Sequence, residues 1–233
     1  MSVLGFPEEL NFRSLKSMFP SRKTEYRKAP MNSQIFNNAG QDIQLVLSKM
    51  ENTFYDPNTL CVNFTVEYGV PSGTPDTNCA FLLGNAYSHF SRQVVRPLSG
   101  QPLETIDNPS LLSNAVLNMV MVGYEKIALS TTFGFNGTHI NTNFGAQIQN
   151  NNSTRVQSYS LPLIGCLNTA KVIPAFISDI EIDLTLNSFN NFIVDVKPLA
   201  ADSSGNPASN IIGYTIKNVE LVCEAITLEQ SGM

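Results

Sequence analysis

The only imidazole groups in the chain that could act as a general base are those of His89 and His139. A hydrolase would also need a nucleophile and a third group that orients the base. His89 lies in a segment with a strand pattern, whereas His139 follows Gly137 and Thr138 in a polar stretch. No Gly-x-Ser-x-Gly nucleophile elbow accompanies either histidine. The sequence therefore predicts a protein that is not an enzyme and has no catalytic residue.

Three carboxylates, those of Asp179, Glu181 and Asp183, alternate with apolar residues along one predicted strand. Since side chains two residues apart on a strand point to the same side, the three form one solvated, acidic face. Such a row could bind a hard cation such as Ca²⁺, which prefers oxygen ligands. A charged row on a strand also discourages incorrect strand pairing. We favour this structural role, so the sequence predicts no metal ligand and no cofactor.

The cysteines are separated by long and irregular spacings, without a Cys-x-x-Cys pair. With two histidines in the chain, this pattern fits neither a zinc site nor the disulfide framework of a secreted domain. A free cysteine within a strand packs as a small apolar residue. We therefore predict reduced cysteines in or near the core of a protein that is synthesised inside a cell. The four residues are Cys61, Cys79, Cys166 and Cys223.

The composition suits a folded protein. Of the 233 residues, 42% are apolar and 14% are charged, which supports a core and argues against disorder. No apolar run approaches the ~18–20 residues that a membrane-spanning helix needs. Met1–Leu10 carries two glutamates and no basic group before an apolar stretch, so we expect no secretory signal peptide.

Charge is unevenly distributed along the chain, whose net charge is −5. Residues 13–28 contain six basic side chains against Glu25 alone, whereas residues 31–233 contain eight basic and sixteen acidic ones. Phe12, Phe19 and Tyr26 are interleaved with the basic residues, a pattern that can serve single-stranded nucleic acid. Both an anionic partner for this segment and a solvated terminal tail are consistent with the pattern.

The clearest strand pattern is Ile177–Leu186, where apolar residues alternate with the acidic ones. We expect Thr59–Tyr68 and Ile212–Leu228 to lie beside it, because both offer a matching apolar face. Ile212–Leu228 changes phase near Asn218, which predicts a β-bulge or a strand that is covered on both faces. Further strands are expected at Gln41–Ser48, Ser88–Leu98, Pro102–Ile106, Val156–Cys166 and Asn187–Val196.

Helices are expected at two places. Asn108 and Pro109 form a helix-start signal, with Asn as the cap and Pro at the first helical position, and Gly123 is expected to end that helix. A short helical turn is expected within Leu167–Ala175. Turns and polar loops are expected at Asn52–Asn58, Gly69–Asn78, Phe133–Thr154 and Ala200–Asn210.

About eight short strands joined by polar loops are typical of a jelly roll and argue against a parallel α/β sheet. Residues 1–40 lack a sustained period and contain three prolines, which favours an extended arm. The sequence therefore predicts an all-β protein: a jelly-roll β-sandwich over residues 41–229 with one or two short inserted helices. An extended N-terminal arm over residues 1–40 precedes it.

Six short motifs follow one another along the chain. They are Phe12-Arg13-Ser14-Leu15-Lys16, Asp56 to Phe64 and Val66, Gly100–Glu104, Tyr159–Leu163, Ile180–Asn187 and Tyr214–Ile226. In this order they resemble the N-terminal jelly-roll half of double jelly-roll major capsid proteins, in the branch of polinton-like viruses and virophages. Members of that family are about twice as long and carry two jelly rolls in one chain.

The resemblance implies a viral capsid protein found in the virion. Such a subunit self-assembles, with other capsid proteins, into capsomers of an icosahedral shell, and the expected homo-oligomer is a trimer. The basic arm over residues 13–28 could then contact the genome, an inner membrane or neighbouring subunits. The subunit is synthesised inside the host cell without a secretory signal peptide, and no small-molecule substrate is expected.

Two other functions remain open at this point. One is a jelly-roll binding module, lectin-like or receptor-binding, with the polar loops as its recognition surface. The other is an enzyme on a cupin-like sandwich, which normally needs several histidines around a metal. Two histidines fifty residues apart make the enzyme the weakest of the three hypotheses.

Overall fold

Two long strands, β4 (Thr53–Gly69) and β13 (Gly213–Leu228), pair antiparallel along most of their length. The computed structural model describes residues 21–71, 79–98, 100–120, 130–134, 144–149, 155–195 and 211–228. Every second residue from Leu60 to Tyr68 is buried, as the alternation in the sequence predicts. This pair is the centre of the first sheet, and its inward face covers the core.

The first sheet has six strands. On one side of β4 and β13, β1 and β2 pair with β13, and on the other side β9 and β10 pair with β4. The bounds of these strands are β1 (Ser21–Lys28), β2 (Ile35–Phe36), β9 (Val156–Pro162) and β10 (Ile173–Pro174).

The second sheet has four strands in the order β3-β11-β6-β7 and faces the first across one core. An edge-to-face contact between Phe64 of β4 and Phe90 of β6, 5.4 Å between ring centroids, joins the two sheets. The strand bounds are β3 (Asp42–Leu47), β11 (Ile180–Leu186), β6 (Phe90–Pro97) and β7 (Glu104–Asp107). With β1, β13, β4 and β9 opposite these four, the eight main strands form the predicted all-β jelly-roll sandwich.

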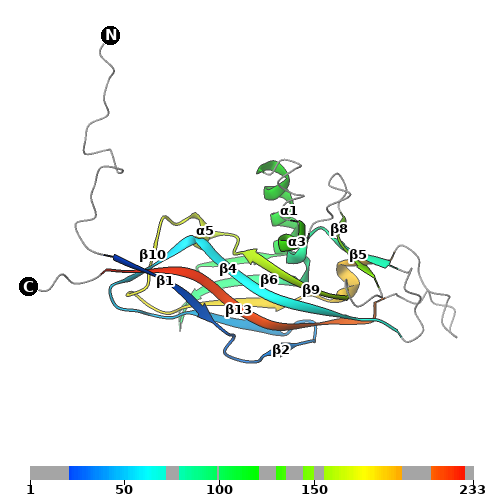
Figure 1. Cartoon of the computed structure of the whole chain (residues 1–233), viewed down its shortest axis with the longest axis horizontal. Coiled ribbons are helices and arrows are strands. Elements are labelled where there is room, and N and C mark those ends of the chain that lie inside the picture. The colour runs from blue at the N-terminus through cyan, green and yellow to red at the C-terminus, as the bar shows by residue number, and fades with distance from the viewer. Residues whose placement is uncertain are drawn as a thin grey trace, which may run out of the picture.

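A third, smaller sheet is built from insertions between the main strands. Its order is β12-β5-β8, and its strands follow β11, β4 and β7 in the chain. In Figure 1 this sheet and α1 gather at one end of the molecule, away from β1 and β10. The inserted elements are β5 (Cys79–Leu83), η2 (Ala86–His89), α1 (Pro109–Val120), α3 (Ser130–Phe133), β8 (Phe144–Gln149), η3 (Phe189–Asn191) and β12 (Ile193–Asp195).

Several predicted elements are confirmed. The helix starts at Pro109, β7 follows β6 as a hairpin, and α5 (Cys166–Thr169) is the expected helical turn. The bulge near Asn218 is also confirmed, because the register against β4 shifts between Lys217 and Glu220. Asn218 has φ +53°, a left-handed conformation that asparagine tolerates better than most residues. None of the helices in the described ranges is both long and apolar enough to cross a membrane.

The expected neighbours of Ile180–Leu186 were wrong. This strand, β11, pairs with β3 and β6, whereas β4 and β13 belong to the opposite sheet. Alternation shows which face of a strand is apolar. It does not show whether another strand with an apolar face lies beside it in the same sheet or opposite it in the facing sheet.

The expected turn over Asn52–Asn58 is present at its start, where Asn52 has φ +51°, but residues 56–58 form a bulge inside β4. The register against β13 shifts between Val222 and Glu224: Val222 lies opposite Cys61, but Glu224 lies opposite Asp56. The turn chemistry is still present: Asp56 Oδ1 accepts the Asn58 N–H at 3.0 Å. Thr59 Oγ1 accepts the Glu224 N–H at 2.8 Å, which satisfies the interrupted ladder.

Three further expectations differ from the structure. The predicted loop Phe133–Thr154 contains the strand β8, and the predicted strand Asn187–Val196 divides into η3 and the short β12. Ser88 and His89 lie in the short helix η2, before β6 begins at Phe90. Gly123 and the loop Ala200–Asn210 lie outside the described residues.

The described part of the predicted arm belongs to the sheet. All eight residues of β1 pair with β13, from Ser21 opposite Leu228 to Lys28 opposite Leu221. No side chain of β1 is fully buried, so the strand lacks the apolar alternation by which the other strands were predicted. Tyr26 holds it across the sandwich: its ring meets Tyr55 edge to face, and its hydroxyl donates to the Val46 carbonyl at 2.8 Å.

We expect Tyr26→Phe to lower the free energy of unfolding by about 1 kcal/mol, because it removes the hydroxyl bonds to β3. Tyr26→Ala also removes the ring contact and should cost about 2–3 kcal/mol. Urea denaturation measures both. Arg22→Ala, an exposed position on the same strand, is the control and should change stability by less than about 0.5 kcal/mol. Equal effects of Tyr26→Phe and Arg22→Ala would contradict the proposed role of the hydroxyl.

Candidate functional site

His89 lies in the core between the two main sheets and is fully buried. Its Nδ1 is 2.7 Å from the Ala86 carbonyl oxygen, and its Nε2 is 2.9 Å from the Tyr68 hydroxyl. A carbonyl oxygen can only accept, so Nδ1 carries the proton and Nε2 accepts from Tyr68. Aromatic rings surround the imidazole within 6.0 Å between centroids: Phe64, Tyr68, Tyr159, Phe192 and Tyr214.

In this environment His89 has a structural role and does not act as a general base. Burial lowers its pKa from 6.5 to about 4, because the charged imidazolium loses its hydration. Both ring nitrogens are bonded to core groups, and burial raises the pKa of Tyr68, so neither partner is poised to give or take a proton near neutral pH. His139, the second candidate base, lies outside the described residues.

The acidic row on β11 is not solvated, contrary to expectation. Glu181 is 7% exposed and Asp183 is 8% exposed. Arg96 of the neighbouring strand β6 binds both carboxylates, through Nε to Glu181 at 2.9 Å and through a terminal nitrogen to Asp183 at 2.9 Å. The row is buried because β11 is an inner strand, so that side chains of β3 and β6 flank it.

Asp183 is the less satisfied of the two buried carboxylates. One of its oxygens, Oδ1, is buried without a hydrogen-bond partner among the described residues. Burial raises the pKa of Asp183, Arg96 opposes this shift, and the charges of Glu181 and Asp42 add to it. The third predicted member of the row, Asp179, instead accepts the Lys49 backbone N–H at 2.5 Å. In the part of the chain that the structure describes, no three His, Cys, Asp or Glu side chains are arranged to hold a metal ion.

The cysteines differ in exposure. Cys223 is buried opposite Tyr26, and burial raises its thiol pKa to about 12. Cys61 is half-buried on β4, as expected of a half-core residue. Cys166 is exposed, contrary to expectation, because it begins the short helix α5 at the surface, where its N–H donates to Glu104. All three are free thiols, and the side chain of Cys79 lies outside the described part.

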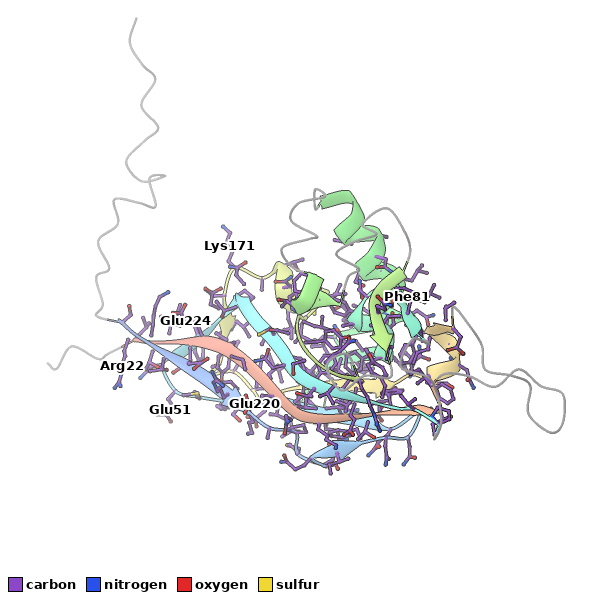
Figure 2. The ribbon with its side chains drawn as sticks, turned by 45° about the vertical axis from the view of Figure 1, so that its right-hand side comes forward. Arg22, Glu51, Phe81, Lys171, Glu220 and Glu224 are labelled. Carbon is purple, nitrogen blue, oxygen red and sulfur yellow. The ribbon has the colours of Figure 1, made fainter. Side chains whose placement is uncertain are left out.

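The basic segment is partly neutralised by β13. Lys23 pairs with Glu224 at 2.8 Å, and Arg27 pairs with Glu25 at 2.9 Å and with Glu220 at 3.4 Å. Figure 2 shows Glu220 and Glu224 spaced along β13 beside β1, with Arg22 at the start of β1. Arg13 and Lys16 lie outside the described residues.

A hollow of about 490 Å³ lies where the three insertions meet. Its size falls within the range of about 300–1,000 Å³ that is typical of small-molecule sites. No sequence pattern indicates this hollow, since its lining comes from segments far apart in the chain and has no common period. The lining residues are Leu83, Gly84, Ser88, Asn108, Ser110, Leu111, Asn114, Asn187, Asn191 and Phe192.

Comparison with known proteins finds similarity in structure alone. No protein-family profile and no curated protein sequence matches the chain. The major capsid protein of Faustovirus matches over 92% of this chain and 56% of its own, with 11% identity and a TM-score of 0.51. A chain in the cryo-EM structure of the Sputnik virophage matches over 100% of this chain and 53% of its own, with 12% identity and a TM-score of 0.52.

The structural matches confirm the predicted resemblance to viral jelly-roll capsid proteins at the level of the fold. They extend over nearly the whole chain, insertions included. The chain spans just over half the length of each of these two proteins.

We expect the stability of the protein to fall as the pH decreases from 6.5 to about 4, because His89 then binds a proton only in the unfolded chain. At 1.36 kcal/mol per pKa unit, the full loss is on the order of 3 kcal/mol. His89→Gln has no proton to bind, so it should flatten this part of the profile. Urea denaturation at several pH values measures the difference between the two proteins. Parallel profiles would show that His89 is not the linked group.

We expect Arg96→Met to lower the free energy of unfolding by about 2–3 kcal/mol at neutral pH, because it leaves two buried carboxylates unpaired. The loss should shrink at mildly acidic pH. Without Arg96 the raised pKa of Asp183 rises further, so the folded variant binds a proton at a pH where the unfolded chain does not, and this stabilises the folded state. Arg92→Met, which breaks an exposed pair with Asp107, is the matched control and should cost less than about 1 kcal/mol. Similar losses for both variants would contradict the argument.

Proposed function

We propose that the protein is a structural subunit of a viral capsid, located in the virion. The observation that carries this proposal is the match of nearly the whole chain to a viral major capsid protein and to a chain of a virophage structure. At 11% and 12% identity the match concerns the fold, and the role follows from the use of that fold in both relatives.

The proposed mechanism is geometric rather than chemical. The two main sheets enclose one continuous core in which the buried His89 is bonded, and the buried Glu181 is paired with Arg96 inside the second sheet. Such a core resists deformation, which suits a wall element. His89 is bonded inside the core and does not line a cleft open to solvent, which supports a role without catalysis.

We further propose that the subunit assembles with copies of itself and with other capsid proteins, as a trimer. Each of these two chains is nearly twice as long as the part that this chain covers, so two parts of this size match the extent of either relative. The basic segment 13–28 is proposed to contact the genome, an inner membrane or a neighbouring subunit. Its pairs with Glu220 and Glu224 are exposed, so salt will weaken them.

One surface is suited to contacts between subunits. Val172, just before β10, and Phe176 and Ile177, between β10 and β11, are exposed apolar residues. In Figure 1, β10 lies at the end of the molecule opposite β5. Phe176 meets Phe54 edge to face at 5.5 Å, so this apolar group continues onto β4. Contiguous exposed apolar side chains commonly mark interaction surfaces.

Measurement of native mass over a range of concentrations tests the proposal. We expect a trimer or a larger species that grows with concentration. Ile177, which is 65% exposed, should matter for this association and not for folding. Both Ile177→Lys and Ile177→Glu should shift the protein toward monomer by at least about tenfold in dissociation constant, since burying a charge at an interface is costly.

Ile177→Val is the matched control, because it keeps the apolar character and should preserve the oligomer. Opposite effects of Lys and Glu would point to net charge rather than to an apolar contact. A wild-type protein that stays monomeric at high concentration, alone and with other capsid proteins, would contradict the capsid role.

A further inference from the structure

The hollow at the junction of the insertions has polar groups that the surrounding structure holds in place. Asn85 is fully buried, and its Nδ2 donates to Oδ1 of Asn114 at 2.9 Å. This bond fixes the orientation of the Asn114 amide, because its oxygen must face Asn85. The NH₂ group of Asn114 is then left toward Gly84, as a pair of donors at the hollow.

Gly84 makes room for that amide. A Cβ atom at this position would lie 2.2 Å from Asn114 Nδ2, and the backbone has φ +90°, which a side chain rarely permits. The positive φ therefore favours glycine at position 84, and a side chain there would displace the Asn114 amide. The close approach keeps the Asn114 amide at the wall of the hollow.

Other groups around the hollow are acceptors. Asn191 Nδ2 donates to Asn187 Oδ1 at 2.9 Å, which leaves Asn191 Oδ1 as an acceptor. Ser88 Oγ donates to the Leu83 carbonyl at 2.5 Å and lies 2.9 Å from Ser110 Oγ. Since the Ser88 proton is already used, Ser110 donates to Ser88 and keeps its own lone pairs for another donor.

The remaining lining is apolar or uncharged. Leu83 and Leu111 are exposed beside these polar groups, and Leu111, in the first turn of α1, is 74% exposed. Every described residue that lines the hollow is uncharged. A charged ligand would lose hydration without gaining a counter-charge there. An uncharged ligand with many hydroxyl groups can use the donors and the acceptors together, and its C–H face can pack on leucine.

We propose that this hollow binds a neutral sugar unit of a glycan. The donors and acceptors around the hollow, with exposed leucines beside them, match a pyranose ring, whose hydroxyls both donate and accept. The site lies at the end of the molecule that carries α1 and β5, apart from the apolar group at Val172, Phe176 and Ile177 (Figure 1). Phe81 of β5 and Lys171, next to Val172, likewise lie apart in Figure 2. The site is therefore independent of the proposed assembly surface, and it goes beyond the capsid role.

Saturation-transfer NMR with the full chain tests the proposal. The probes are glucose, galactose, mannose and N-acetylglucosamine, with N-acetylneuraminic acid as an anionic comparison. We expect saturation transfer to at least one neutral sugar, with a dissociation constant on the order of millimolar because the sugar makes few contacts. We expect no transfer to the anionic sugar. No transfer to any neutral sugar up to about 20 mM would overturn the proposal, and so would binding of the anionic sugar alone.

Two variants locate the site. Leu111→Glu places a carboxylate at the hollow, and Asn108→Gly removes an amide where φ is +54°, a conformation that glycine adopts without strain. Each should weaken sugar binding about tenfold or more, which is the scale of one lost polar contact. Val116→Glu is the matched control for Leu111→Glu, because Val116 is an exposed apolar residue of the same helix that does not line the hollow.

Val116→Glu should change the affinity by less than about twofold, well below the effect of one hydrogen bond. Equal binding by Leu111→Glu and the wild type would overturn the assignment of the site. Native mass, measured on the same variants, should match that of the wild type. Loss of sugar binding with intact assembly thus separates this proposal from the capsid role.

Discussion

The antiparallel pairing of β4 with β13 is the constraint on which the rest of the structure depends. Every other strand of the first sheet pairs with one of these two. Both strands change phase: buried residues shift from Ile216 to Val219 on β13 and from Pro57 to Leu60 on β4. Because one residue of slip turns every side chain to the other face, each bulge is needed to keep both halves of its strand apolar toward the core.

The polar groups inside the sandwich reinforce this arrangement. His89 connects η2 to Tyr68 of β4, and Arg96 of β6 holds Glu181 and Asp183 of β11. His89 is buried with partners on η2 and β4, so a shift of one against the other would leave a ring nitrogen unsatisfied, whereas the Arg96 pairs hold β6 to β11 within the second sheet. A sandwich restrained in this way is suited to a wall that must keep its shape, as the proposed capsid role requires.

The two ends of the molecule have different chemistry. The end near β10 exposes the apolar residues Val172, Phe176 and Ile177, which suit contact with another subunit. At the other end, three insertions form a small sheet, the helix α1 and an amide-lined hollow. The insertions also share the core of the sandwich, since Leu82, Ala86 and Ile148 are buried in it. The proposed division between assembly and recognition follows from this separation.

The sequence by itself determined the strands with strict alternation, the start of α1 at Pro109 and the bulge at Asn218, because these depend on residues within a few positions of one another. Only the tertiary structure decided that β11 pairs with β3 and β6, that β1 joins β13, and that Glu181 and Asp183 are buried by Arg96. It also decided that Asn108, Asn114 and Asn191 line one hollow. Strands pair through backbone hydrogen bonds, which are the same for every residue type, so the choice of partner leaves little trace in the side chains.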